Sequence, residues 1–419
     1  MSHADQKNMD KAPPGESPPR KPSLLRHLAG RKYIKQLEPF IAGLRRCHSS
    51  HGNRLLYYDD VLTILLLGFF NPCIRSLRKF ELHSQVPGVN ECLSHNRVCR
   101  STLSDALRVL DPQLLRPLVG ELRAHLPRHA PLEPDLEEIY DKIIAFDGSY
   151  FKVPAQVFWA LQERGGGKAK PGRQVGLDLH FCLATGTPEG ISLGGAGSSE
   201  AQALAAHVQA EAIYVADRGT FSFEALRAIV QGQGHVVWRL KEVIGFRCQR
   251  ENPLTDQDRA HGVLSDRVGV LTGSACHLAP EVPVREIRIA NPDDPAHPLR
   301  LLTDRLDLPA YIIGLIYRRR WEIELFFRWL KVYAHFKHMI SHSPRGMETW
   351  FYVAVIGTLL MSLYTGQRPN TYNFVAMELI LSGQARYEDL AAGLERLARE
   401  RDRARQRYAQ RKAAQKKEA

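Results

Sequence analysis

Hydrophobic and polar residues follow two different periods along this chain, and these periods divide it into helical and strand-rich regions. From residue 31 to residue 137, apolar residues recur at helical spacing, most clearly in segments 58–70 and 101–110. In the second segment Leu103, Leu107 and Leu110 fall on one face. This pattern is compatible with the second helix of a helix-turn-helix and equally with an ordinary bundle helix. We predict that residues 31–137 form a helical, DNA-binding region.

Between residues 138 and 240, short apolar runs of strand length alternate with amphipathic helical stretches. Strands are expected at residues 143–147, 175–184, 190–195, 212–217 and 235–240, and helices at residues 199–208 and 221–230. This alternation is typical of the α/β class, in which helices pack on a sheet. The first and fourth of these strands each end in an aspartate, Asp147 and Asp217.

The pattern changes again beyond residue 240. Residues 241–308 lose the helical period and carry short strand-like pieces between turns, which predicts a β-rich insertion. A long helix is expected from residue 309 to about residue 338, and an apolar helix from 350 to about 364. Residues 366–419 are predicted to form a helical, basic carboxy-terminal segment.

The long helix carries four polar residues on an otherwise apolar surface. At helical spacing Tyr317, Arg320, Glu324 and Lys331 share a stripe about 60° wide. Most other positions are apolar, which fits a helix packed inside a domain. Because unpaired buried charge is costly, these side chains need partners, and a metal ion or a phosphate would serve. Glu322 points to another side of the helix, so it is not our choice of functional acid.

Charge narrows the range of partners. The net charge is +12 and the pI is about 9.4, which favours a polyanion such as nucleic acid or an anionic membrane surface. Residues 1–30 are rich in proline and lysine and are predicted to be a disordered basic arm. We interpret Arg239 and Lys241 as solvated surface charges.

A membrane role is not expected. The apolar runs at residues 61–70 and 353–363 are too short to span a bilayer, and we find no basic amphipathic helix with a strong apolar face. Seven scattered cysteines have neither a zinc-ligand spacing nor an even number, so a reducing cytoplasm is the expected compartment.

The acidic residues suggest a metal site. Two aspartates at the ends of neighbouring strands and a glutamate on a later helix are the carboxylates that can hold a pair of Mg²⁺ ions for phosphoryl transfer. Asp147, Asp217 and Glu324 fit these positions. Either aspartate alone would be explained as well by a turn. The combination with the polar stripe favours the metal site.

The same residues resemble a known family. Tyr317, Arg320, Glu324 and Lys331 reproduce the spacing Tyr-x2-Arg-x3-Glu-x6-Lys of DDE transposases from bacterial insertion sequences of the insertion-sequence-four type. The segments IAFDGSYFKVP, YVADRGTFS and TDRLDLPA followed by YRRRW resemble those around the family's catalytic acids. The resemblance covers about residues 140–365.

The resemblance implies an RNase H-like catalytic domain over residues 138–365, with the β-rich insertion inside it. Asp147, Asp217 and Glu324 would bind two Mg²⁺ ions, for which Mn²⁺ substitutes, and would catalyse DNA cleavage and strand transfer. Tyr317, Arg320 and Lys331 would hold the DNA backbone near the cut end, which suits the chemistry of these side chains.

The resemblance also implies the partners: double-stranded DNA at the element's terminal inverted repeats, target DNA, and a second copy of the chain in a homodimer. The expected location is the bacterial cytoplasm, in association with the nucleoid. Some related transposases hold a flipped base with an aromatic side chain, for which Trp238 and Trp321 are available. Two alternatives remain: a catalytically silent RNase H-like DNA-binding protein, and a plain RNase H-like nuclease.

Overall fold

The structure is a computed structural model, and it divides the chain into two compact units. It describes residues 41–47, 56–71, 73–90, 93–162, 172–195, 199–273, 283–291, 294–333, 339–381, 384–385 and 387–418. The first unit comprises Met1–His125 and His338–Tyr364, and the second comprises Leu126–Lys337 and Thr365–Ala419. The predicted arm over residues 1–30 lies outside the described residues.

The first unit is helical over its described residues. Its elements are α3 (Tyr58–Phe69), α4 (Leu77–His83), α5 (Pro87–Asn90), α6 (Arg100–Val109), η2 (Pro112–Leu115), α7 (Arg116–Ala124) and α13 (Pro344–Thr365, of which all but Thr365 belongs to this unit). Leu103, Leu107 and Leu110 are buried together, as their spacing predicts. The role of this region in DNA binding stays a prediction.

Helix α13 is the core helix of the first unit. Trp350 makes edge contacts with Phe69 of α3 and Phe80 of α4, at ring-centroid distances of 6.3 and 6.4 Å. Gly357 lets α3 come close, because a Cβ atom there would lie 2.6 Å from the ring of Phe69. The domain boundaries predicted from the sequence placed this helix in the catalytic domain, residues 138–365. Its contacts instead place it with the amino-terminal helices.

Helix α13 is longer than the apolar run at residues 353–363, which was too short to span a bilayer. Residues Pro344–Leu363 are long and apolar enough to cross a membrane, although the uninterrupted apolar run is shorter. The structure buries 94% of the most apolar window of this segment inside the protein. The helix is therefore best explained as a core helix, because core helices can be as long and as apolar as membrane spans.

The second unit is built on one mixed sheet, to which all ten strands of the described residues belong. The strands are β1 (Ile143–Val153), β2 (Leu161–Gln162), β3 (Arg173–Cys182), β4 (Thr187–Gly194), β5 (Ile213–Ala216), β6 (His235–Arg239), β7 (Gly245–Glu251), β8 (Val263–Thr272), β9 (Val284–Ile289) and β10 (Leu299–Thr303). Their order is β2-β3-β1-β5-β6-β10-β9-β8-β7, and β4 also pairs with β3. The mixed α/β class expected from the sequence is confirmed.

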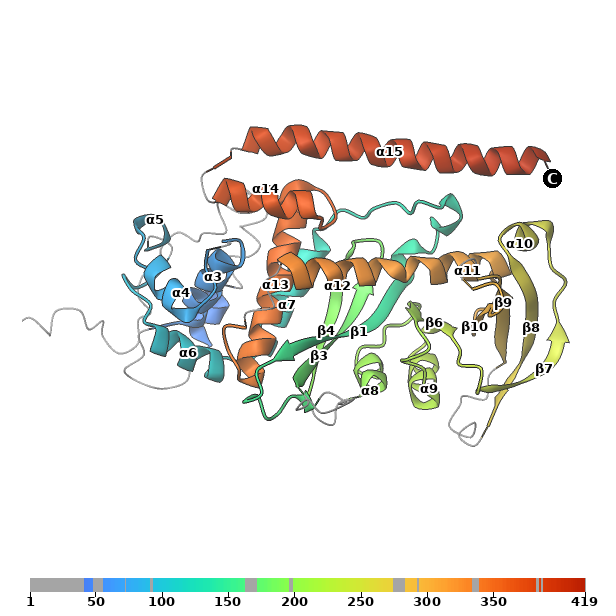
Figure 1. Ribbon diagram of the computed structural model, residues 1–419, viewed down its shortest axis with the longest axis horizontal. Coiled ribbons are helices and arrows are strands. Elements are labelled where there is room, and N and C mark those ends of the chain that lie inside the picture. The colour runs from blue at the N-terminus through green and yellow to red at the C-terminus, as the bar shows by residue number, and fades with distance from the viewer. Residues whose placement is uncertain are drawn as a thin grey trace, which may run out of the picture. The chain divides into compact units, whose positions relative to one another are not determined.

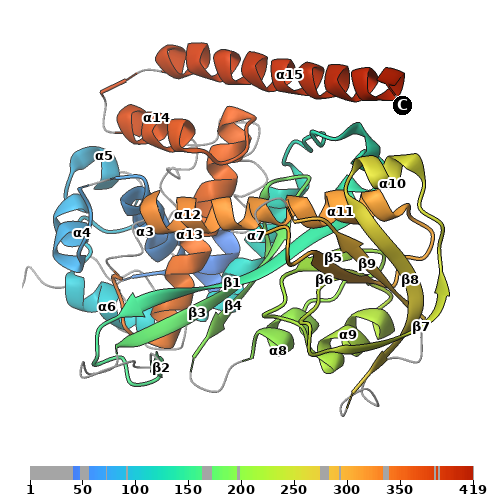
Figure 2. The same ribbon diagram turned by 45° about the vertical axis from the view of Figure 1, so that its right-hand side comes forward.

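Helices cover both faces of this sheet (Figures 1 and 2). The helices of this unit among the described residues are η3 (Pro134–Leu136), η4 (Tyr140–Lys142), α8 (Glu200–Ala205), α9 (Phe223–Gln231), α10 (Asp256–Ala260), α11 (Ala310–Arg319), α12 (Trp321–Tyr333), α14 (Thr371–Leu381) and α15 (Tyr387–Glu418). Helices α8 and α9 lie on one face, and α11 and α12 follow one another along the other. Residues 387–418 of the carboxy-terminal segment are helical.

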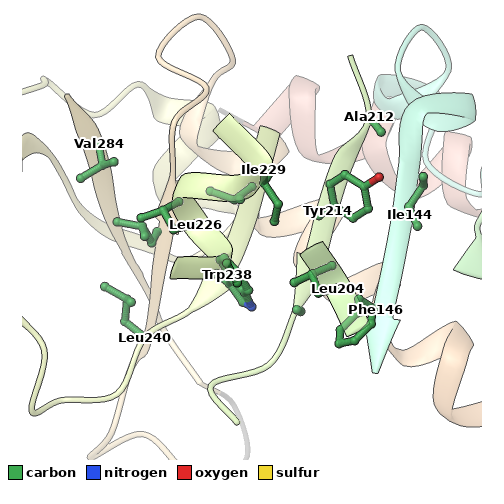
Figure 3. Close-up of a cluster of buried hydrophobic side chains, with 14 of the residues drawn as sticks. Ile144, Phe146, Leu204, Ala212, Tyr214, Leu226, Ile229, Trp238, Leu240 and Val284 are labelled. Atoms are coloured by element: carbon green, nitrogen blue, oxygen red, sulfur yellow. The ribbon is translucent and has the colours of Figure 1, made fainter. Parts of the chain in front are cut away.

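The core under α8 and α9 is formed by alternate residues of the central strands (Figure 3). Ile144 and Phe146 of β1, Tyr214 of β5 and Trp238 of β6 point into it, with Leu226 of α9. Because strand side chains alternate between faces, the residues next to Phe146 point to the α11–α12 face. This alternation decides which strand residues can reach the helix that carries the polar stripe.

The predicted β-rich segment does form strands, with the short helix α10 between two of them. These strands are not separate from the rest: β10 pairs antiparallel with β6, and β9, β8 and β7 follow it outward. The segment therefore extends the central sheet. Its status as an insertion into an RNase H-like core stays a prediction.

Candidate active site

Two of the predicted acids are neighbours because of the strand register. Strands β1 and β5 pair in parallel, and the last pair in register is Phe146 with Ala216. Asp147 and Asp217 are the next residue on each strand, so both leave the parallel pairing at the same edge of the sheet. Strands in such a pair lie about 4.8 Å apart.

Asp147 is inside β1, whereas the sequence pattern placed it at the end of a strand. The parallel pairing stops before it, but β1 continues as far as Val153 by pairing with β3. The strand end expected at Asp147 is therefore the point where β1 stops pairing with β5 and pairs only with β3. Strand β5 ends at Ala216, and Asp217 follows it directly, one residue beyond the strand rather than at its last position.

The long helix is interrupted within the polar stripe. Helix α11 ends at Arg319 and α12 begins at Trp321, so a single helix over residues 309–338 is a wrong prediction. At the junction the N–H of Arg320 donates to Tyr317 O at 3.1 Å, and the N–H of Ile323 donates to Arg320 O at 3.2 Å. These bonds span three residues rather than four and tighten the chain there. Residues 334–338 lie outside the described residues.

The Arg320 guanidinium lies between predicted acids. Its Nη2 is 2.6 Å from Glu324 Oε1, and its Nη1 is 3.7 Å from Asp147 Oδ2. Arg320 also helps to lower the pKa of Asp217 electrostatically. The structure thus gathers the three predicted acids around one cation.

The two aspartates differ in their affinity for protons. Burial raises the pKa of Asp147 to about 6, against the attraction of Arg320. Burial acts in the same direction on Asp217, but hydrogen bonds from the Arg218 backbone and the Tyr317 hydroxyl outweigh it, so the pKa of Asp217 is lowered. At neutral pH both carboxylates are therefore ionised, with Asp147 closer to protonation.

Tyr317 orients Asp217 directly. Its hydroxyl donates to Asp217 Oδ1 at 2.9 Å, and burial, with the nearby carboxylate, raises the pKa of Tyr317 to about 12. From the other side Trp238 Nε1 donates to Thr220 Oγ1 at 2.9 Å, and that hydroxyl donates to the Asp217 carbonyl at 2.8 Å. Trp238 is therefore a buried anchor of this turn, whereas Trp321 is 49% exposed.

Arg239 belongs to the site, which corrects its reading as a solvated surface charge. Its Nη1 lies 3.6 Å from Asp217 Oδ1, and its side chain is 30% exposed. Strand β6 runs parallel to β5, so the residue that ends β6 lies at the same edge as Asp217. If the strands 212–217 and 235–240 had been predicted to pair in parallel, the sequence would have placed Arg239 next to Asp217.

Lys331 lies two turns further along α12 than Glu324. Its Nζ is 5.3 Å from the centre of the Phe151 ring, which comes from the same face of β1 as Asp147. Burial lowers the pKa of Lys331, and Asp147 partly opposes this. The ammonium group is thus held near the acids without an ion pair of its own among the contacts of the described residues.

The donor set suits a hard divalent cation, although the acids do not form a closed cage. Among the described residues, no group of three or more His, Cys, Asp or Glu side chains is placed to hold a metal ion. The carboxylates converge on Arg320, whose Nε is buried without a hydrogen-bond partner in the described structure. Carboxylate oxygens are the ligands that Mg²⁺ prefers, so a bound cation would compete with this guanidinium for them.

Sequence reasoning missed a further acid beside the site. Asp178 of β3 is in register with Gly148, on the α8 side of the sheet, and is only 5% exposed. A Cβ atom at Gly148 would lie 2.5 Å from Asp178 Oδ1, so glycine makes room for the carboxyl group. Burial, with Glu200 and Asp147, raises the pKa of Asp178 to about 7. Its segment, residues 175–184, alternates apolar and polar residues, so the sequence favoured a polar face for Asp178 rather than a buried site.

This shift makes stability depend on pH. The folded state holds the Asp178 proton up to about pH 7, whereas the unfolded chain releases it near pH 4. Stability should therefore fall as pH rises across this window. We expect Asp178→Asn to raise the free energy of unfolding above pH 7 by a few kcal/mol at most (about 1.4 per pKa unit), and therefore to raise the melting temperature there. Near pH 5 it should change little.

Thermal unfolding with a chelator present, at both pH values, measures this effect. Asp141→Asn is the matched control, because Asp141 forms a surface pair with Arg128 and is 44% exposed. A gain from Asp178→Asn that is equal at both pH values would contradict the proposed protonation.

A profile of the family described as "Transposase DDE domain" matches residues 141–360, which is more than half of the chain. This range contains Asp147, Asp217, Glu324 and the rest of the polar stripe.

Curated relatives and a solved structure add to this match. A Sinorhizobium fredii protein described as a transposase is 23% identical over 156 residues, 37% of this chain and 43% of the relative. One described as the transposase of insertion sequence element IS5377, from Geobacillus stearothermophilus, is 26% identical over 152 residues, 36% of this chain and 39% of the relative. The chain thus spans less than half the length of these relatives.

Among solved structures, a piggyBac transposase synaptic complex with hairpin DNA aligns over 88% of this chain and 84% of that chain. The TM-score is 0.34 and the sequence identity is 11%, a likeness too weak to bear on the argument.

Proposed function

Because the chain belongs to the family of transposase DDE domains, we propose that it binds the ends of its own insertion sequence and catalyses their metal-dependent cleavage and strand transfer. The observation that carries this proposal is that Asp147 and Asp217, at one edge of the sheet, and Glu324 of α12 lie around the Arg320 guanidinium. These three acids are far apart in the sequence, and a fold that brings such residues together is what a catalytic site requires.

The proposed roles follow from the contacts. DDE transposase domains use divalent metal ions, and here Asp147, Asp217 and Glu324 would hold them. We propose two Mg²⁺ ions, replaceable by Mn²⁺, which when bound polarise phosphate and lower the pKa of an attacking hydroxyl. Tyr317 keeps Asp217 ionised and oriented.

Arg320 and Lys331 supply positive charge to the DNA backbone. The Arg320 guanidinium, which now pairs with Glu324, would fork onto a phosphate if a cation took its place at the carboxylates. Lys331 already lacks a carboxylate within ion-pair distance in the described structure and adds a point charge beside the cut end.

The finer assignment also belongs to this proposal. The spacing of Tyr317, Arg320, Glu324 and Lys331 supports the insertion-sequence-four type. The strand order β4-β3-β1-β5-β6, antiparallel on one side of β1 and parallel on the other, supports an RNase H-like core with β7–β10 as the insertion. We further propose a homodimer on paired ends, acting on target DNA in the bacterial cytoplasm.

The test is cleavage of a labelled duplex carrying the gene's flanking ends, with Mg²⁺ or Mn²⁺. Metal-dependent cutting at the element boundary supports the proposal. If the protein binds these ends and never cuts them with either metal, it is a catalytically silent DNA-binding protein. Cutting of duplexes or RNA–DNA hybrids without regard to the ends would instead indicate a plain nuclease.

Lys331→Ala tests the phosphate role. Losing one phosphate contact should weaken binding of the end duplex and reduce the slope of log affinity against log salt by about 1. A gel-shift titration at several salt concentrations measures both. Lys142→Ala is the control, because Lys142 lies at the opposite end of β1 and pairs with Glu211 at the surface. Equal behaviour of the two variants would exclude Lys331 from the DNA contact.

A further inference from the structure

A second charged site lies on the other side of the helices that carry the polar stripe. A cavity of about 540 Å³ is lined by Arg319, Glu322, Arg368, Arg401 and Arg405, with Tyr140, Tyr372 and Asn370. Helix α15 runs alongside α11 and α12, on the side away from the sheet, and contributes Arg401 and Arg405 (Figures 1 and 2). We call this cavity the arginine pocket.

Two of the arginines in the pocket are already paired. Arg319 Nε donates to Glu133 Oε2 at 2.7 Å, and its Nη1 lies 3.4 Å from Glu322 Oε1. Arg368 pairs with Glu322 and donates to the Tyr140 hydroxyl at 2.9 Å. The two carboxylates are therefore taken up by these two guanidinium groups.

The other two arginines have no carboxylate within ion-pair distance in the described part of the chain. Within the described residues the hydrogen-bond partner of Arg401 is a ring nitrogen, His129 Nδ1, at 3.2 Å. Burial, with Arg368 and Arg401, lowers the pKa of His129 to about 3, so this imidazole is neutral and adds no charge. Burial and the nearby Arg368 also lower the pKa of Arg401. Two positive charges thus remain unneutralised in a half-buried pocket.

An anion would remove this imbalance. Unpaired charge away from water is costly, and a guanidinium group forks readily onto the oxygens of a phosphate. The cavity is within the size range of small-ligand sites, about 300–1,000 Å³, and exceeds the needs of one phosphate. Tyr140, Tyr372 and Asn370 add aromatic and amide surface of the kind that contacts a base.

We propose that the arginine pocket binds a phosphate-bearing anion of nucleotide size, with Arg401 and Arg405 as the phosphate ligands. The site is separate from the proposed catalytic acids, since Arg319 pairs with Glu133 and Arg368 with Glu322, whereas Arg320 pairs with Glu324. The phosphate comes from a free nucleotide or from nucleic acid, and its chemistry is the same in both cases.

The first arm of the test uses inorganic pyrophosphate and the full chain. It should raise the melting temperature more than sodium chloride of equal ionic strength does. Arg401→Gln, which keeps a donor for His129, should lose at least half of this shift, as should Arg405→Gln. Arg403→Gln should keep it, because Arg403 is exposed on the same helix. Without pyrophosphate, Arg401→Gln should melt no lower than Arg403→Gln, because it removes an unpaired charge.

The second arm identifies the source of the phosphate by gel shift with a duplex DNA. Weaker binding by Arg401→Gln than by Arg403→Gln assigns the pocket to nucleic acid. Unchanged DNA binding with a lost pyrophosphate shift assigns it to a free nucleotide. The proposal is overturned if pyrophosphate acts only as salt and DNA binding is equal in both variants. No arm requires catalysis, so the proposal stands or falls independently of the transposase activity.

Discussion

Replacing Asp217 by asparagine should abolish cleavage of the end duplex, with a loss on the order of 10³-fold or more, as for other residues that act as a catalytic unit. The amide keeps the shape of the side chain but removes the negative charge that a divalent cation needs. In the wild type Tyr317 and Arg239 contact Asp217, and they should still hold the turn after β5 in place in the variant. Folding and DNA binding should therefore change little.

Asp147→Asn and Glu324→Gln should have the same effect, and the double variants should lose no more than the singles. Asp141→Asn is the matched control, because it also removes one aspartate charge, at an exposed pair with Arg128. Single-turnover cleavage and a gel shift, measured on the same preparations, separate chemistry from binding. A variant of one acid that cuts at the normal rate would remove that acid from the site.

The sequence predicted the acids because their positions are set by local pattern. Asp147 and Asp217 each follow a short apolar run, and parallel pairing of two such runs brings their ends together. The stripe was readable because side chains three, four and seven residues apart share a helix face. Both inferences use only the period of one element and the pairing of two.

What the sequence did not predict depends on contacts between distant elements. The break at Arg320 follows from short-range hydrogen bonds that no apolar pattern records. Asp178 lies in a strand whose sequence alternates apolar and polar residues but which is buried on both faces around it. Only the register with Gly148 shows why a carboxyl group fits there. Arg401 gave no signal either, because a basic tail is normally solvated, and its burial requires α15 to pack beside Arg368.

The strands that follow β6 support the start of helix α11 through a buried arginine. Arg285 of β9 donates to both carboxylate oxygens of Asp266 on β8, at 2.6 and 2.5 Å, and both side chains are about 95% buried. The same guanidinium donates to the carbonyl groups of Leu308 and Arg305, just before α11 begins. One side chain therefore ties the outer strands to the start of the helix that carries Tyr317.

Arg285→Met should consequently destabilise the second unit by about 3–5 kcal/mol, because it leaves the Asp266 carboxylate buried without its partner. Chemical denaturation measures this loss. Asp307→Ala is the control, since it breaks an arginine–aspartate pair in which the aspartate is 61% exposed and should cost about 1 kcal/mol or less.

The double variant Arg285→Met with Asp266→Leu separates the buried charge from the helix anchor. It should recover most of the stability, since no charge is left unpaired. It should not recover the full cleavage rate, because the carbonyl groups of Leu308 and Arg305 still lack their donor and α11 is less firmly placed. Full recovery of both would show that Arg285 serves only to neutralise Asp266.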